Sequence, residues 1–135
     1  MKVKLFSKPL TDIFSNLPVR ACYLYGSQAK NQEREDSDYD LAVFVENKNK
    51  VNYRDFLSIL NANFFNPEKL HLILVDLNSS SPLLLYQIVK NGQLFFENHR
   101  GGHVELESYI MRLFFDDQYR NQIYYQKLKK SYADR

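Results

Sequence analysis

Apolar residues in this chain fall into short runs that alternate with stretches in which they recur every three or four positions. Short apolar runs are typical of strands, and a period of about 3.6 residues is typical of helices. The runs predict strands over residues 19–25, 39–46, 70–77 and 94–97, the last at a sheet edge. The periodic stretches predict helices over residues 10–17, 53–65, 82–90 and 104–130. This order predicts an α/β (α+β) fold, with a mixed β-sheet flanked by helices.

Several polar signals mark where these elements begin and end. Ser81 before Pro82 is typical of a helix start, and Asn91-Gly92 is typical of a helix end. The pair Asp116-Asp117 is expected to kink or break the last helix. At 135 residues the chain predicts one domain, 1–135, with a core over about 8–97 and a C-terminal helical segment over about 99–130.

Two polar motifs adjoin the first two apolar runs. Gly26-Ser27 follows the first run directly, and Asp38 and Asp40 open the second after an interval of ten residues. Residues two apart on a strand share a face, so the two carboxylates are expected to lie about 7 Å apart along it. Like charges held together are unfavourable unless a cation or a proton lies between them. The pattern therefore predicts a metal-binding carboxylate pair beside a phosphate-holding turn.

Each half of this pattern has simpler interpretations. A Gly-Ser pair is commonly a turn, and an Asp-x-Asp triplet is commonly a solvated loop. A calcium loop is excluded because Leu41 and Asn47 stand where its Gly and Glu are required. A P-loop is excluded because no Gly-Lys-Ser/Thr follows Gly26. Gly26 permits close backbone approach, and Ser27 offers a hydroxyl and an N–H to a phosphate and is expected to cap a short helix over 28–31.

The string YGSQAKNQEREDSDYDLAVFV resembles the signature of the DNA polymerase β-like nucleotidyltransferase superfamily, and in particular its minimal nucleotidyltransferases. Many of these are antitoxins of HEPN-domain toxins in type VII-like toxin–antitoxin pairs. The resemblance implies AMP transfer from ATP to a hydroxyl, expected to be a tyrosine of the toxin. It also implies two Mg²⁺ ions, held by Asp38, Asp40 and a third acid on a neighbouring strand. Many relatives have Arg where Gln28 stands, so a basic phosphate contact is missing there.

The third acid is expected to be Asp76, at the far end of the third predicted strand. An Asp ending a strand covered on both faces must reach solvent, a cap or a metal. The open alternative is that Asp76 caps the turn at Asn78. Lys30 and Arg34 are expected to assist a phosphate, or only to offset Glu33 and Glu35.

Composition and charge bear on compartment and partners. The single Cys22 lies in an apolar run, so it is expected in the core and is consistent with a reducing cytoplasm. No apolar run is long enough to span a membrane. The net charge of +2 is unevenly spread, with acids over 33–40 and bases at Lys127, Lys129 and Lys130. The basic, Tyr-rich end of the chain predicts either a docking surface for a protein partner or a solvated tail.

No direct contact with nucleic acid is expected. His71 is expected to pack in its strand, and His99 and His103 to lie in a loop or cap. Three other functions stay open: an antitoxin that acts by binding alone, a nucleotidyltransferase for a small molecule, and a DxD glycosyltransferase. The last two need additional domains that 135 residues do not hold.

Overall fold

The computed structural model describes residues 5–15, 17–25 and 38–133. Four strands form one sheet in the order β3-β2-β1-β4. The strands are β1 (Val19–Tyr25), β2 (Tyr39–Val45), β3 (Leu70–Val75) and β4 (Gln93–Glu97). β1 pairs antiparallel with β2 and β4, whereas β2 and β3 run parallel. The predicted mixed sheet is confirmed, and β4 lies at an edge as expected.

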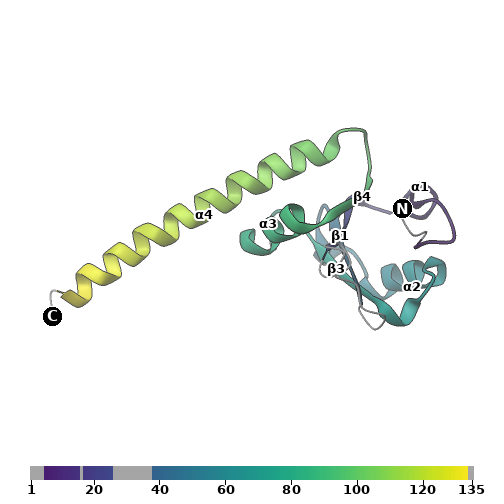
Figure 1. Ribbon diagram of the computed structural model, residues 1–135, viewed down its shortest axis with the longest axis horizontal. Coiled ribbons are helices and arrows are strands. Elements are labelled where there is room, and N and C mark those ends of the chain that lie inside the picture. Colours follow the sequence, from purple (N-terminus) through teal and green to yellow (C-terminus); the bar gives the residue numbers. More distant parts are fainter. Residues whose placement is uncertain (1–4, 16, 26–37, 134–135) are drawn as a thin grey trace.

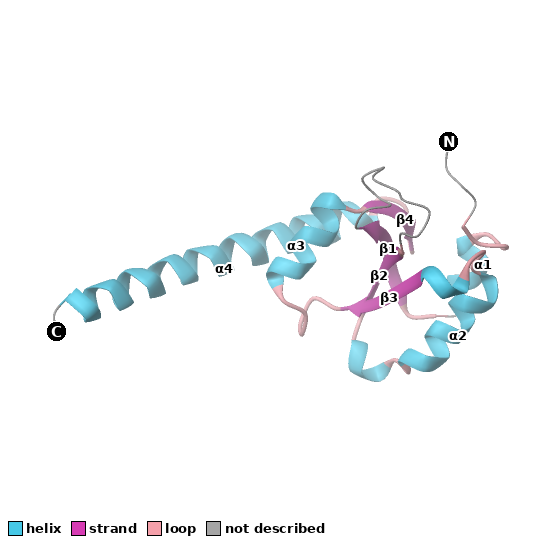
Figure 2. Cartoon of the chain, turned by 60° about the horizontal axis from the view of Figure 1, so that its bottom comes forward, coloured by secondary structure: helices cyan, strands magenta, loops and turns pink. Residues whose placement is uncertain are grey.

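Helices cover both faces of this sheet (Figures 1 and 2). They are α1 (Leu10–Phe14), α2 (Tyr53–Asn63), α3 (Pro82–Asn91) and α4 (Gly102–Ala133), with short 3₁₀ turns at Lys48–Lys50 and Pro67–Lys69. α1 ends at Phe14, three residues before the predicted end at Leu17. α4 runs without interruption through Asp116 and Asp117, so the predicted kink or break there is wrong.

The alternation of side chains along the strands divides the core into two layers. Leu41, Val43 and Val45 of β2 point towards α1 and α2, where they pack with Phe56 and Leu60. The intervening β2 residues pack in the layer formed with α3 and α4, whose members include Ala42, Phe44, Val75, Leu85, Ile88, Leu106 and Ile110. Cys22 is fully buried, which confirms it as a core residue, and burial raises the pKa of its thiol.

Among the described residues, α4 packs on the domain through its first turns. Leu106 and Ile110 are buried in the second layer, and Phe114 stacks on Tyr86 of α3 at a ring-centroid distance of 3.9 Å. At about 1.5 Å per residue the 32-residue helix is roughly 48 Å long. Its C-terminal half therefore projects from the body of the molecule, as Figure 1 shows.

Candidate active site

The two predicted carboxylates lie together at one end of the sheet. Asp40 is the second residue of β2 and is opposite Tyr25, the last residue of β1. Asp38 immediately precedes the strand, and both side chains are partly open to solvent, at 46% for Asp38 and 31% for Asp40. Tyr39 between them packs on the other face, against the rings of Phe64 and Phe65. The prediction that Asp38 and Asp40 share a face of the strand is confirmed.

A histidine completes this cluster. The parallel register of β2 and β3 places His71 directly beside Asp40. One ring nitrogen, Nε2, lies 3.4 Å from Asp38 Oδ2, and the other, Nδ1, lies 3.5 Å from Asp40 Oδ1. The imidazole therefore bridges the two carboxylates, and the expectation that His71 packs in its strand is wrong: its side chain is 60% exposed.

The environment of the pair disfavours negative charge on Asp40. Burial raises the pKa of the Asp40 carboxyl, and the nearby charge of Asp38 raises it further. His71 acts in the opposite direction through its charge and a hydrogen bond, but it only partly offsets the rise. Tyr25 lies on the same face, and burial together with Asp40 raises the pKa of its hydroxyl. A bound cation would relieve the repulsion between the carboxylates.

The structure places Asp76 elsewhere, so its expected position beside the pair is corrected. β2 and β3 are parallel and Asp40 is opposite His71, which leaves Asp76 beyond the opposite end of β3. At about 3.3 Å per residue, the interval from His71 to Asp76 is roughly 16 Å along the strand. A side chain at that distance does not share a metal ion with Asp38 and Asp40.

Asp76 instead holds a turn. Its carboxylate accepts hydrogen bonds from the backbone N–H groups of Lys48 (2.8 Å), Asn78 (3.1 Å) and Ser79 (2.6 Å), and from the Ser79 hydroxyl (2.6 Å). Only 2% of the residue is exposed. Burial alone would raise the pKa of Asp76, but these hydrogen bonds outweigh it and lower the pKa from 3.8 to about 2. The alternative of a turn cap at Asn78 therefore describes this residue.

Four predicted site residues lie outside the described part of the chain: Gly26, Ser27, Lys30 and Arg34. The predicted short helix over 28–31 lies there too. Gly26 follows Tyr25 in the sequence, and Tyr25 is paired with Asp40. The proposed contacts of these four residues with a nucleotide remain predictions.

A divalent cation fits the chemistry of the pair, because two carboxylates on one face supply the oxygen ligands that Mg²⁺ prefers. Asp38 and Asp40 are the residues that would hold it. Within the described ranges, no three His, Cys, Asp or Glu side chains are already arranged as a metal-binding group. Substrate oxygens and water commonly fill the remaining positions around Mg²⁺.

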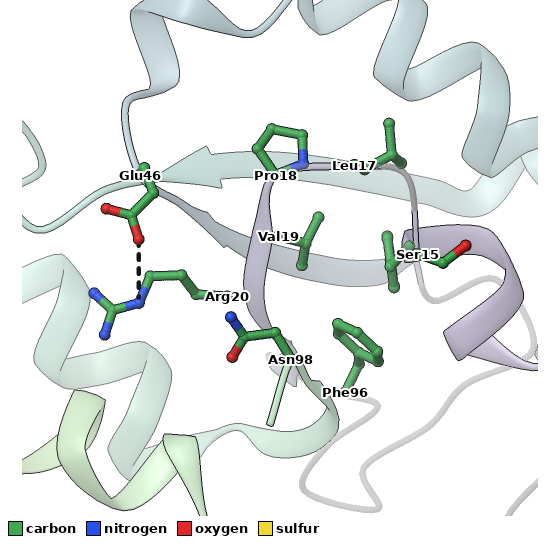
Figure 3. A pocket seen from close by; sticks show the side chains of 9 residues that line it. Ser15, Leu17, Pro18, Val19, Arg20, Glu46, Phe96 and Asn98 are labelled. Carbon is green, nitrogen blue, oxygen red and sulfur yellow. Dashed lines mark ion pairs between the residues drawn. The ribbon is translucent and has the colours of Figure 1, made fainter. Parts of the chain in front are cut away.

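A pocket of about 290 Å³ lies at the other end of the sheet (Figure 3). It is lined by Phe14, Val19, Phe96 and neighbouring residues, with an ion pair of 3.8 Å between Arg20 Nε and Glu46 Oε1 at its rim. Val19 is at the start of β1, whereas Tyr25 at its end adjoins Asp40. The pocket is therefore separate from the carboxylate pair.

His71 and Tyr25 are members of the site that sequence reasoning missed. A strand–helix–strand unit commonly forms a parallel pair, and parallel strands align their starts. That rule places the start of the third strand, His71, beside Asp40, and places its end, Asp76, far away. The signal was present in the predicted order of elements.

The sheet, its helices and the carboxylate pair define a class of α/β protein with an acidic site at one sheet end. The family model for "Polymerase beta, Nucleotidyltransferase" matches residues 8–101. This chain belongs to that nucleotidyltransferase family. A search of curated proteins found no match.

Solved structures with the same fold include toxin–antitoxin complexes. One, a toxin–antitoxin with AMP-PNP, is 17% identical with a TM-score of 0.63, and the match covers 90% of this chain and 96% of that one. A second, tri-AMPylated Shewanella oneidensis HEPN toxin in complex with MNT antitoxin, is 17% identical with a TM-score of 0.59 over 89% and 92%. A third, the toxin–antitoxin MntA-HepT, is 18% identical with a TM-score of 0.56 over 89% and 93%. These similarities extend the family's fold to most of the chain.

Proposed function

We propose that this nucleotidyltransferase is an antitoxin that transfers AMP from ATP to a hydroxyl group of a HEPN-domain toxin, and so silences it. The observation that carries the proposal is the pairing of Asp38 and Asp40 on one face, beside the strand end that leads into Gly26-Ser27. The complexes with AMP-PNP and with an AMPylated HEPN toxin support it, because their antitoxins share this fold.

The chemistry assigned to the site is an in-line displacement at the α-phosphate. The acceptor oxygen, on a tyrosine of the toxin, forms a bond to the α-phosphorus while the bond to the leaving oxygen breaks. Pyrophosphate departs, and the hydroxyl proton passes to solvent. Asp38 and Asp40 would hold Mg²⁺, which would offset charge on the phosphate oxygens. Gly26 and Ser27 are proposed to contact the triphosphate, with Lys30 and Arg34 as weaker candidates.

In this proposal the acceptor hydroxyl comes from the toxin, so the protein needs a surface on which the toxin docks. The projecting half of α4 is the proposed docking surface. It carries exposed aromatic residues, among them Tyr119, Tyr124 and Tyr125, and the bases Lys127, Lys129 and Lys130. Aromatic side chains are enriched at the centres of protein interfaces.

The cytoplasm is the proposed compartment, on the ground of the single buried Cys22. Among the described residues, no helix is both long and apolar enough to cross a membrane.

The alternative is an antitoxin that neutralises its toxin by binding alone. Replacing one carboxylate of the pair distinguishes this function from AMP transfer. Asp38→Asn removes a charge with little change in shape. We expect it to keep wild-type affinity for the toxin in a binding assay and to lose neutralisation of toxicity on co-expression. Asp12→Asn, an exposed aspartate of α1, is the matched control and should behave as wild type. Full neutralisation by Asp38→Asn would favour masking.

A further inference from the structure

The third side chain at the carboxylate pair is an imidazole. His71 lies between Asp38 and Asp40, with one ring nitrogen near each carboxylate. Asp76, which follows the last residue of the same strand, is buried in a turn at the other end, and four donors occupy its oxygens. Besides the Tyr25 hydroxyl, the described donor atoms at this site are therefore carboxylate oxygens and imidazole nitrogens.

This donor set differs from the one that suits Mg²⁺ alone. Mg²⁺ is a hard cation that prefers oxygen, whereas imidazole suits later first-row cations such as Co²⁺, Ni²⁺ and Zn²⁺. In the part of the chain that the structure describes, His71 is accessible, since 60% of its side chain is exposed. Only one ring nitrogen can face such a cation at a time, so binding requires the ring to turn from its present position between the two carboxylates.

We propose that His71 is a metal-ligating residue of the Asp38–Asp40 site and biases it towards cations that accept nitrogen, with Co²⁺ favoured over Mg²⁺. The inference rests on the proposed function, because it concerns the same metal site. It adds a residue that sets metal preference, and it holds for cation binding whether or not a toxin is modified.

Titration calorimetry on the purified full chain with Co²⁺ or Mg²⁺ alone tests the proposal, with no toxin present. Losing a partner of a metal ligand commonly costs about 10–100-fold in affinity, so losing the ligand should cost at least tenfold. We expect His71→Ala to weaken Co²⁺ binding by at least about tenfold and to leave Mg²⁺ binding within about twofold. His71→Asp, which supplies a third carboxylate, should strengthen Mg²⁺ relative to Co²⁺.

His99→Ala is the matched control, because it removes an exposed imidazole away from the site and should leave both affinities unchanged. Equal Co²⁺ affinities of the wild type and His71→Ala would overturn the proposal, as would a wild type that binds Mg²⁺ more tightly than Co²⁺. AMP transfer measured separately distinguishes the two failures. If the wild type transfers AMP but His71→Ala leaves Co²⁺ binding unchanged, only the metal-ligating role of His71 is overturned. The proposed function then stands.

Discussion

A buried carboxylate is stable only where hydrogen-bond donors replace its water, and Asp76 meets that condition. Three backbone N–H groups and one hydroxyl converge on it from two segments, at Lys48 and at Asn78-Ser79. The side chain therefore ties the start of the segment after β2 to the turn that leads into α3. Its role is structural. Because it lies far from Asp40, changing it should affect the stability of the fold and not the reaction.

Asp76→Asn tests this separation. The amide keeps the shape of the side chain but replaces one acceptor oxygen with an N–H₂ group. The N–H donors that faced that oxygen then lose their hydrogen-bond acceptor. We expect a loss of about 2–3 kcal/mol in the free energy of unfolding, measured by urea denaturation. Below its melting temperature the variant should still transfer AMP, whereas Asp38→Asn should not. A stable Asp76→Asn that has lost transfer would return Asp76 to the catalytic group.

The pH dependence of stability follows from the same residue. The pKa of Asp76 is about 2 in the folded chain, below its ordinary 3.8. A lowered pKa contributes stability that is fully present above about pH 4 and is lost as the pH falls towards 2. We expect the free energy of unfolding to drop across this window, and to drop less in Asp76→Asn. Hydrogen bonds from Gly101 and His103 lower the pKa of Glu97 to about 2. Glu97 therefore keeps part of the pH dependence of stability in the variant.

At the scale of elements, α4 combines an anchored start with an end that projects from the domain. Glu97 accepts hydrogen bonds from the N–H groups of Gly101 (2.8 Å) and His103 (3.1 Å) and from the His103 ring, which fixes where the helix begins. Leu106 and Ile110 then bury its first turns. Aspartate in a helix interior costs only about 0.7 kcal/mol, so Asp116 and Asp117 do not stop a helix anchored in this way.

Ile110→Ala is expected to destabilise the domain by about 2–5 kcal/mol, because the residue is fully buried between the sheet and α3. Met111→Ala, one position along and 40% exposed, is the control and should stay within about 0.5 kcal/mol. Thermal denaturation of both variants measures the difference. Equal melting temperatures would mean that α4 is not anchored through this face.

The projecting half of α4 should matter for partner binding and not for folding. Tyr124 and Tyr125 are 63% and 65% exposed, so replacing both with alanine should leave the melting temperature nearly unchanged. The same variant should lose at least tenfold in affinity for the toxin, since exposed tyrosines are typical interface anchors. Gln126→Ala, on the same turn, is the control. Unchanged toxin affinity in the double variant, measured by calorimetry, would place docking elsewhere.

At the scale of the whole molecule, the sheet order decides which residues meet. Local patterns predicted the four strands and the four α-helices of the described residues, although several bounds differ. The pair Asp38 and Asp40 followed from the two-residue period of one strand. The partners of that pair did not follow, because they depend on pairing between strands distant in the sequence. β1 brings Tyr25 and β3 brings His71 to the end of the sheet where Asp40 lies. The same parallel register of β2 and β3 places Asp76 at the opposite end of the sheet.

The central claim is AMP transfer, and intact-mass spectrometry of the HEPN-domain toxin tests it most directly. The toxin is incubated with this protein, Mg²⁺ and ATP, and the variant Asp38→Ala/Asp40→Ala is the control. We predict that the toxin gains one or more AMP units with the wild type and none with the variant. A toxin of unchanged mass in a complex that still forms would contradict the claim.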